Sequence, residues 1–391
     1  MEPKIRFSSS NILYEEKTLS EISTINPKTI VPLEFEYVDL ESVSGTEMTS
    51  HRTEHKATAP SRAQRLAKKG DIFYQTVRPY QKNNYYFDMD DDNYVFSTGY
   101  AQIRPSIYGK YLFTLLQNDS FLKQVLDNCA GTSFPAINPS VLSRLSVRIC
   151  TDKQEQQAIA SYFTSLDSQI SVSTSRLASL KQMKAASLQA MFPQEGETVP
   201  KIRFKGFEGE WKKVKADSIF KTFNEKNRSD LPVLSATQDR GMVTRESIGY
   251  NIFHDTSNEA TYKHILPGQF VIHLRSFQGG FAHSEIEGIA SPAYTIMDFK
   301  NKDLYHDYYW RYVFMSKEFI KRLELITYGI RDGRSISYDE FKEMSFLVPS
   351  KEEQIKIASY LKNLDRQISL QSQRLEKLKQ IKSACLDKMF V

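Results

Sequence analysis

Basic, aromatic and amide side chains gather in one stretch of the first third of the sequence. The stretch contains Arg62, Arg65, Lys68, Lys69, Arg78 and Lys82, followed or interleaved by Tyr80, Gln81, Asn83, Asn84, Tyr85 and Tyr86. Lysine and arginine neutralise phosphates, whereas arginine, asparagine and glutamine form paired hydrogen bonds with base edges. The chemistry that these residues could perform is therefore nucleic-acid binding.

The sequence does not indicate a catalytic or metal centre. It has no GxxxxGK[ST] or GxGxxG phosphate loop, no HExxH and no cysteine/histidine zinc spacing. The Asn/Asp-Pro-Pro-aromatic tetrapeptide of nucleotide methyltransferases is approached only at 138–140, Asn-Pro-Ser. His264, His273 and His283 lack acidic or cysteine companions, and the acidic run at 88–93 lacks the spaced ligands of a calcium loop, which indicates a solvated hairpin tip. We expect no catalytic residue, metal ligand or cofactor here, and hence a recognition protein.

Composition indicates an ordinary globular chain in a reducing compartment. The 391 residues allow two or three domains, and the net charge of +5 is modest, so only its distribution can support nucleic-acid binding. Cys129, Cys150 and Cys385 are scattered and odd in number, which argues against a disulfide framework. No stretch approaches the roughly 18 apolar residues of a membrane span, and the N-terminus does not resemble a signal peptide. We expect a cytoplasmic protein.

Residues 153–192 and 351–390 are the same segment written twice. About half of the positions are identical without a gap, including the Ile-Ala-Ser-Tyr run and the closing Met-Phe. The duplication extends further, because PKIRF at 3–7 recurs at 200–204 and KKGDIFYQTVRP at 68–79 is echoed by 266–277. A period of about half the chain predicts a duplicated two-part molecule rather than a solenoid.

The duplicated segments carry a coiled-coil pattern. Apolar residues alternate in steps of four and three over several heptads, at Ile159, Phe163, Leu166, Ile170, Leu177 and Leu180 in the first copy, and at Ile357, Leu361, Leu364, Ile368, Leu375 and Leu378 in the second. Ser173 and Gln371 occupy matching seam positions. They could be polar residues that fix register within the seam, or they could mark a locally solvated stretch.

Each segment predicts one helix of about 40 residues, roughly 60 Å long. The Pro/Gly/Glu tract at 193–199 ends the first helix and serves as a linker. The simplest packing pairs the two helices antiparallel within one chain, and a homodimeric coiled coil is the alternative.

The two remaining blocks alternate short strand-like runs with one helical region each. The strand-like runs lie at 35–40, 71–77 and 94–98 in the first block, and at 269–275 and 293–299 in the second. The helical stretches, at 107–126 and 307–326, occupy matching places. The expected fold is α+β: two globular domains at 1–152 and 200–349, joined by antiparallel helices at 153–192 and 350–391 in a pseudo-twofold duplication.

The whole chain resembles the specificity subunit of type I restriction-modification systems. The residues that carry the resemblance are the repeated PKIRF, Ser61-Arg62-Ala63, Lys68 to Ile72, Arg78-Pro79, the GTSFPAIN segment at 131–138, and Glu155-Gln156 at the start of the first Ile-Ala-Ser-Tyr helix, with the helical signals repeated at the C-terminus. The second block departs from this pattern, with Gly268-Gln269 in place of Gly-Asp and 329–336 in place of GTSFPAIN. The resemblance implies that the two blocks are target-recognition domains for unrelated half-sites, which accounts for this departure.

The same resemblance implies a mechanism and partners. Each domain would read one half of a bipartite site in double-stranded DNA, and the helices would set the gap between the halves. Two methyltransferase subunits and restriction/motor subunits would dock on this chain, and S-adenosylmethionine, ATP and Mg would be used in those partners. This chain itself would be non-catalytic.

Candidate DNA contacts are Arg62, Arg78, Lys82 and Asn83 in the first block and Arg275, Gln278, Arg331 and Arg334 in the second. Each could instead be a solvated charge or a framework ion pair, and the equivalence of Arg78 and Arg275 in domains of different specificity favours phosphate contact or framework for these two. Candidate partner contacts are Tyr162, Leu166, Ile170, Tyr360, Leu364 and Ile368, which are alike in both repeats. Their likeness could also reflect packing of the repeats against each other.

Two other classes of function remain open at this point. One is an enzyme that cleaves or methylates DNA alone, against which the missing cofactor motifs argue. The other is a coiled-coil protein-interaction scaffold without DNA specificity, which negligible affinity for duplex DNA would favour.

Overall fold

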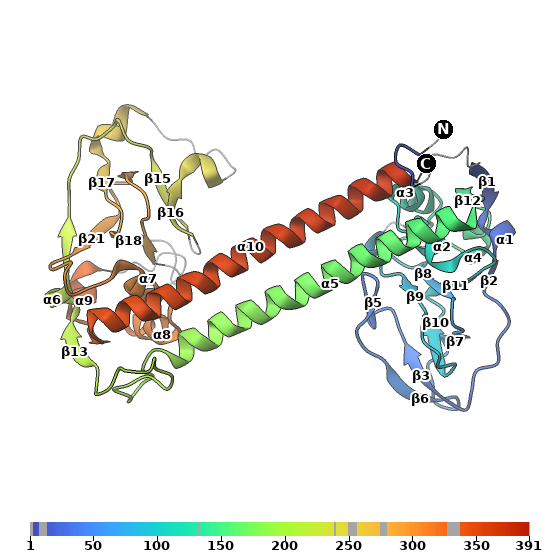
Figure 1. Cartoon of the computed structure of the whole chain (residues 1–391), viewed down its shortest axis with the longest axis horizontal. Helices are drawn as coiled ribbons and strands as arrows, with labels where there is room; N and C mark the ends of the chain where they lie inside the picture. The colour runs from blue at the N-terminus through green and yellow to red at the C-terminus, as the bar shows by residue number, and fades with distance from the viewer. Residues whose placement is uncertain are drawn as a thin grey trace. The chain divides into compact units, whose positions relative to one another are not determined.

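The computed structural model describes residues 3–7, 14–131, 133–237, 240–248, 256–273, 280–326 and 337–390. The chain forms two compact units. The first unit comprises 1–174 with 373–391, and the second comprises 175–372. We call the part of the first unit before residue 153 the first head, and the part of the second unit at 191–350 the second head. Each unit is described by itself (Figure 1).

Two long helices, α5 (Lys153–Ala190) and α10 (Lys351–Met389), confirm the expected helical repeats. In the first unit, the start of α5 lies antiparallel to the end of α10, with Asp167 paired to Lys382 at 2.5 Å. In the second unit the roles are exchanged, and Lys184 of α5 pairs with Asp365 of α10 at 2.5 Å. Both contacts lie within one chain, as the intramolecular pairing requires.

The expected apolar seam is buried. Phe163 and Leu361 are 1% and 0% exposed, and the two matching polar residues, Ser173 and Gln371, are only 3% and 8% exposed. The two polar residues therefore belong to the buried seam, and the alternative of a solvated stretch is wrong.

The first head is built from twelve strands among the described residues. They are β1 (Tyr14–Thr18), β2 (Ser23–Ile25), β3 (Glu34–Val38), β4 (Val43–Ser44), β5 (Glu47–Met48), β6 (Arg52–His55), β7 (Ala63–Leu66), β8 (Ile72–Gln75), β9 (Tyr85–Tyr86), β10 (Tyr94–Ser97), β11 (Tyr100–Pro105) and β12 (Ser146–Cys150). Its helices are α1 (Leu19–Ile22), the 3-10 turn η1 (Pro79–Gln81), α2 (Gly109–Leu115), α3 (Asp119–Asp127) and α4 (Pro139–Leu142).

These strands form two four-stranded sheets, in the orders β6-β3-β10-β7 and β2-β11-β8-β9, and two pairs, β1-β12 and β4-β5. The β1-β12 pair is antiparallel, with Tyr14 opposite Cys150. Because β9 and β10 belong to different sheets, the acidic run at 88–93 connects two sheets and is not a hairpin tip. Asp88 and Asp90 of this run pair with Lys110 and Lys69, each at 2.6 Å.

The second head follows a similar plan, but its described strands are grouped into different sheets. Its strands are β13 (Lys212–Lys215), β14 (Phe220–Phe223), β15 (Leu234–Thr237), β16 (Gly241–Thr244), β17 (Lys263–Ile265), β18 (Phe270–Ile272), β19 (Phe281–His283), β20 (Gly288–Ala290), β21 (Thr295–Phe299) and β22 (Ser345–Val348). Its helices are α6 (Ala216–Ile219), η2 (Arg245–Ile248), η3 (Thr256–Thr261), α7 (Asp307–Met315), α8 (Lys317–Ile326) and α9 (Tyr338–Glu343). The described sheets are β14-β21-β18-β19 and the pairs β13-β22, β15-β16 and β17-β20.

Each helical stretch expected in the heads is divided into two helices. In the first head Asn118 interrupts the stretch, because its side-chain oxygen accepts from Ser120 N and thereby caps α3. Its amide nitrogen also donates to Leu386 O at 2.8 Å, which ties the head to α10. In the second head the break falls at Ser316, whose hydroxyl donates to Val313 O.

A Glu-Gln pair at the start of each long helix anchors the adjoining head. Gln156 accepts from Tyr108 N and donates to Cys150 O, and Gln354 likewise accepts from His306 N and donates to Pro349 O. Glu155 accepts from Phe7 N at 3.1 Å. The second-unit counterpart, Glu353, binds Arg203 through both carboxylate oxygens, at 2.7 and 2.8 Å. The repeated PKIRF segments are thus fastened to the helix starts.

We expect the substitution Glu353→Gln to destabilise the second unit strongly. The Glu353 side chain is 1% exposed and that of Arg203 is 18% exposed, so the change leaves a largely buried guanidinium without its counter-charge. Breaking a buried pair in this way costs about 3–5 kcal/mol. Urea unfolding of the variant should show this loss, whereas Glu352→Gln, at the neighbouring exposed position, should change the free energy of unfolding little. Equal stability of the two variants would contradict the anchoring role.

Candidate nucleic-acid interface

The loop at 76–84, between β8 and β9, carries most of the basic and amide residues singled out in the first head. Its tip is η1, and Tyr80 at the centre of the tip is 51% exposed. The residues on either side, Arg78 and Lys82, both have left-handed backbones, with φ of 54° and 55°. Such a conformation is costly for residues other than glycine and persists only where surrounding contacts impose it, often at functional sites.

A buried set of amides imposes this conformation. Gln75 is 1% exposed, and its amide nitrogen donates to Val77 O and to Gln81 Oε1, both at 2.8 Å. The Gln75 side-chain oxygen accepts from Asn83 N at 3.1 Å. Asn84 accepts from Gln75 N through Oδ1 at 2.8 Å and donates to Gln117 Oε1 at 3.4 Å. The tip therefore packs on a layer of hydrogen-bonded amide side chains from Gln75, Asn84 and Gln117, which we call the floor of the loop.

The segment that follows α3 meets this loop. Arg78 N donates to Pro135 O at 2.8 Å, and Val77 forms a β-bridge with Ala136. The Arg78 guanidinium lies over the Phe134 ring, 4.7 Å from its centroid, and this ring is 62% exposed. Arg78, Tyr80 and Phe134 therefore form one surface that combines a cation with exposed aromatic rings, a combination suited to phosphates and bases.

The other candidates in the first head are placed differently. Lys82 is paired with Asp119 and also donates to Gln117 O, and the Asn83 side-chain oxygen accepts from Gly45 N at 2.9 Å. These side chains hold the loop in place. Arg62 is exposed, and among the described residues its guanidinium has no hydrogen-bond or ion-pair partner. Arg62 is therefore available to a phosphate.

Titratable groups around this surface are shifted mainly by burial. Burial raises the pKa of the Tyr85 and Tyr86 hydroxyls and lowers the pKa of the Arg65 guanidinium. Both hydroxyls are neutral at physiological pH, as that of free tyrosine is. Within the described ranges, no group of histidine, cysteine and carboxylate side chains is arranged to hold a metal ion.

The candidates in the second head, Arg275, Gln278, Arg331 and Arg334, all lie outside the described residues. The departure from Gly-Asp to Gly268-Gln269 can, however, be explained. In the first head, the buried Asp71 binds Arg104 at 2.7 Å across β8 and β11. In the second head, Gln269 donates to Asp298 at 3.0 Å across β18 and β21. The carboxylate lies directly before β8 in the first head but on β21 in the second, where Lys302 also pairs with it at 3.1 Å, so neither of these two carboxylates is buried without a counter-charge.

Five of the six partner candidates, all except Ile170, pack on the core of their own unit. Leu166 and Leu364 are buried in the cores, at 6% and 3% exposure. The Tyr162 hydroxyl lies 3.4 Å from Cys385 Sγ, and the Tyr360 hydroxyl lies 3.3 Å from Ser187 Oγ. Ile170 and Ile368 are half-buried.

A different pair of apolar residues faces outward at matching positions of the two repeats. Val172 of α5 is 65% exposed and Leu370 of α10 is 56% exposed. Each residue number in the second repeat is 198 higher than its counterpart, so these two positions are equivalent. The steps of three and four residues from Val172 lead to Ser168, Ser165 and Ser161, all exposed, which defines an outer stripe. In the sequence, these two exposed positions could have been found as apolar residues that lie off the coiled-coil seam in both repeats.

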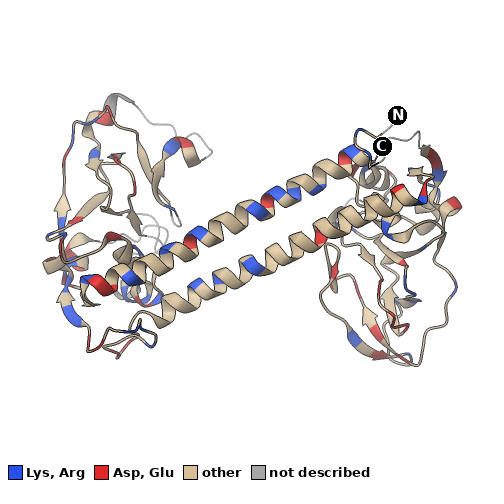
Figure 2. Cartoon of the chain, in the orientation of Figure 1, with Lys and Arg blue, Asp and Glu red and all other residues tan. Residues whose placement is uncertain are grey.

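The two helices differ in their content of basic residues. α10 contains nine lysine and arginine residues and α5 contains four (Figure 2). For example, Lys362 and Arg366 of α10 stand where α5 has Thr164 and Ser168. Two copies of one partner, one on the stripe of each helix, would therefore meet equivalent apolar residues but different charges.

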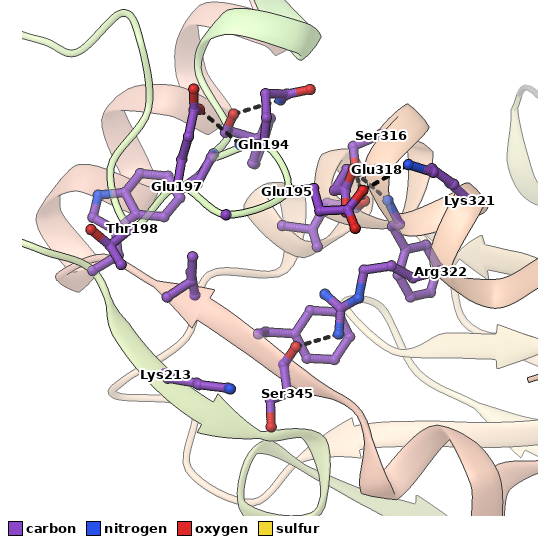
Figure 3. Close-up of a pocket in the computed structure, with 18 of the residues that line it drawn as sticks. Gln194, Glu195, Glu197, Thr198, Lys213, Ser316, Glu318, Lys321, Arg322 and Ser345 are labelled. Atoms are coloured by element: carbon purple, nitrogen blue, oxygen red, sulfur yellow. Dashed lines mark hydrogen bonds and ion pairs between the residues drawn. The ribbon is translucent and has the colours of Figure 1, made fainter. Parts of the chain in front are cut away.

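Each unit also has a cavity at the same place of its fold. The cavity of the second unit, about 560 Å³, is lined by Phe192, Ser316, Phe319 and the linker residues 193–198 (Figure 3). The cavity of the first unit, about 440 Å³, is lined by the equivalent Phe390, Asn118 and Phe121. Near the linker, Glu195 pairs with Lys321 at 2.8 Å and Arg322 donates to Ser345 O. Among the described candidates, none of Arg62, Arg78, Lys82 and Asn83 lines either cavity, so the candidate interface of the first head is a loop surface.

Comparison with known proteins agrees with this arrangement. The chain matches the model of the type I restriction modification DNA specificity domain twice, over residues 11–182 and 208–380. It is 34% identical to the specificity subunit of the type I restriction enzyme HindI from Haemophilus influenzae over 139 residues, which is 34% of this chain and 30% of that relative. The matched stretch therefore spans less than a third of the curated relative.

Two solved structures share the fold across the chain. One is the S subunit of a type I restriction-modification system from M. genitalium, with a TM-score of 0.65, 15% identity, and coverage of 100% of this chain and 99% of that one. The other comes from a study of complex assembly and conformational transition of the type I R-M system, with a TM-score of 0.54, 21% identity, and coverage of 96% and 97%. Within the described residues, no helix is long and apolar enough to cross a membrane. With two copies of the domain covering most of its length, the chain belongs to the family of type I restriction-modification DNA specificity proteins.

Proposed function

We propose that this chain is the DNA-recognition subunit of a type I restriction-modification complex, in which each head reads one half of a bipartite site. The observation that carries the proposal is the presence of two specificity domains whose anchoring residues match while their outer loops differ. Adenine methylation and restriction would be carried out by partner subunits. S-adenosylmethionine, ATP and Mg would be used there, and this chain would contribute no catalytic residue.

In the first head, the reading surface would be the loop at 76–84 together with Phe134. Arg78 and Arg62 would contact phosphates or bases, and Tyr80 and Phe134 would offer ring faces and edges. Lys82 and Asn83 would support the loop. In the second head, Arg275, Gln278, Arg331 and Arg334 are proposed as the corresponding contacts on the basis of the repeat alone.

Two methyltransferase subunits are proposed to dock on the two helical repeats. Val172 and Leu370 would be the apolar anchors. A single exposed apolar residue is ordinary on a protein surface, so the proposal rests on the equivalence of these two exposed positions in the two repeats. Tyr162, Ile170, Tyr360 and Ile368 are partly exposed and are proposed as further contacts on other faces of the helices, whereas Leu166 and Leu364 would support the helices from within.

Exchange of one head tests the proposed function directly. Replacement of residues 1–152 by the first head of another family member should change one half of the methylated sequence and leave the other half unchanged. The reason is that each head is a separate set of strands with its own core. Mapping of methylated adenines in cells that express the chimera with the methyltransferase subunit gives the readout. Changes in both halves, or methylation without sequence preference, would contradict the proposal.

The salt dependence of DNA binding should distinguish Arg62 from Lys82. A free cation that contacts a phosphate releases counterions, so Arg62→Ala should reduce the slope of log K against log salt by about 1. Lys82 is already paired with Asp119, so Lys82→Gln should leave the slope nearly unchanged. Fluorescence anisotropy of the complex with labelled duplex over a range of salt concentrations would measure both slopes. Equal reductions in the two variants would refute the assignment.

The stoichiometry of the complex tests the docking positions. Val172→Asp and Leu370→Asp should each remove one methyltransferase subunit, because a buried carboxylate without a partner is costly at an interface. The double variant should bind none. Native mass spectrometry would measure the mass of each complex. Ser165→Asp, which adds the same charge to the same stripe without removing an apolar residue, controls for charge alone, and circular dichroism checks the helix content. A full complement of partners on the double variant would exclude these residues as anchors.

A further inference from the structure

The orientation of the Gln75 side-chain amide is determined by its hydrogen bonds to the backbone of Val77 and Asn83. Its amide nitrogen faces the carbonyl oxygen of Val77 at 2.8 Å, and its side-chain oxygen faces the backbone N–H of Asn83 at 3.1 Å. A carbonyl can only accept and a backbone N–H can only donate. The NH2 group of Gln75 therefore points toward Val77 and its oxygen toward Asn83, and the reverse orientation would lose both hydrogen bonds.

This orientation determines that of the next amide. The second hydrogen of the Gln75 NH2 group is directed at the Gln81 side chain, 2.8 Å away. Because Gln75 offers a donor, Gln81 must present its oxygen, and the Gln81 NH2 group then faces away from the floor of the loop. Gln81 is exposed, and among the described residues its NH2 group has no hydrogen-bond partner.

The position of Gln81 is fixed as well as its orientation. Its backbone N–H donates to Arg78 O at 3.0 Å within the 3-10 turn. After the tip, Lys82 is held by Asp119 of α3, and Asn84 by Gln117 in the turn between α2 and α3. Before the tip, Arg78 N donates to Pro135 O, so the chain is fastened on both sides. A side chain held in this way loses little conformational entropy when it binds a ligand.

We infer that Gln81 is a specificity-determining residue of the first head, which donates its NH2 hydrogens to a guanine in the major groove, and that Gln75 is the residue that positions it. This inference rests on the proposed function and assigns one base contact within it. A glutamine that can present both its oxygen and its NH2 group pairs with adenine, which offers one acceptor and one donor. Gln81 presents donors, and the major-groove edge of guanine offers two acceptors, N7 and O6.

Two substitutions separate the reading residue from the positioning residue. Gln81→Glu replaces the outward donor by an acceptor, so affinity for the guanine-containing site should fall about ten-fold or more. The loss should be confined to one position of the first half-site. Gln75→Met keeps the volume but removes both determining hydrogen bonds, so Gln81 can turn and accept adenine. Discrimination between guanine and adenine at that same position should then fall about ten-fold.

The experiment uses the full chain in complex with its methyltransferase subunit. Its affinity is measured for duplexes that carry every single base substitution in both half-sites, and thermal unfolding checks each variant. Gln157→Glu, an exposed change of the same charge on α5, is the control and should match the unchanged protein. If Gln75→Met fails to fold, Gln81→Glu alone decides, because Gln81 is at the surface.

The outcomes are distinct. A change of preference at a single guanine of the first half-site supports the inference. An unchanged profile for Gln81→Glu overturns it, and so does an equal loss at all positions of the first half-site, which would indicate a structural role. If the unchanged complex prefers no sequence at all, the proposed function fails instead.

Discussion

Each unit depends on one buried arrangement, in which a glutamate and a glutamine at the start of a long helix hold the head that precedes it. Glu155, Gln156, Glu353 and Gln354 are all at most 3% exposed. A buried carboxylate or amide is tolerated only when its hydrogen bonds are made, and both glutamines use backbone groups of the head for this purpose. The direction of each helix relative to its own head is thereby set by several directional contacts rather than by apolar packing alone.

This constraint explains which parts of the two heads can differ. A change at the anchor would leave a buried polar group without a partner, whereas a change in an outer loop meets only solvent. A change at a position between the anchor and the outer loops needs a second change that restores the lost hydrogen bond or ion pair. Asp71 with Arg104 and Gln269 with Asp298 show one such case. The carboxylate comes from opposite members of the contact in the two heads, and it has a basic partner in both, Arg104 for Asp71 and Lys302 for Asp298. The anchors are therefore kept alike while the sheets and loops vary outward from them.

The sequence predicted the helices and the duplication because their signals are local and repeated. The seam at Phe163 and Leu361 follows from heptad spacing alone. The contacts of the loop could not be predicted in this way. Lys82 pairs with Asp119, which is 37 residues away, and no periodic pattern connects the two. Asn118 divides a continuous helical pattern because its side chain caps α3, a choice between helix interior and cap that periodicity does not record.

The proposed partner surface shows a second limit of inference from the sequence. Residues that are alike in two repeats can be alike because they pack against each other, and Leu166 and Leu364 belong to this class. An apolar residue that is kept off the seam in both copies carries more information, because internal packing does not require it there. Val172 and Leu370 meet this condition, and their exposure in the structure removes the packing explanation. In a duplicated chain, equivalence between the repeats therefore indicates a binding surface only when burial has been excluded as its cause.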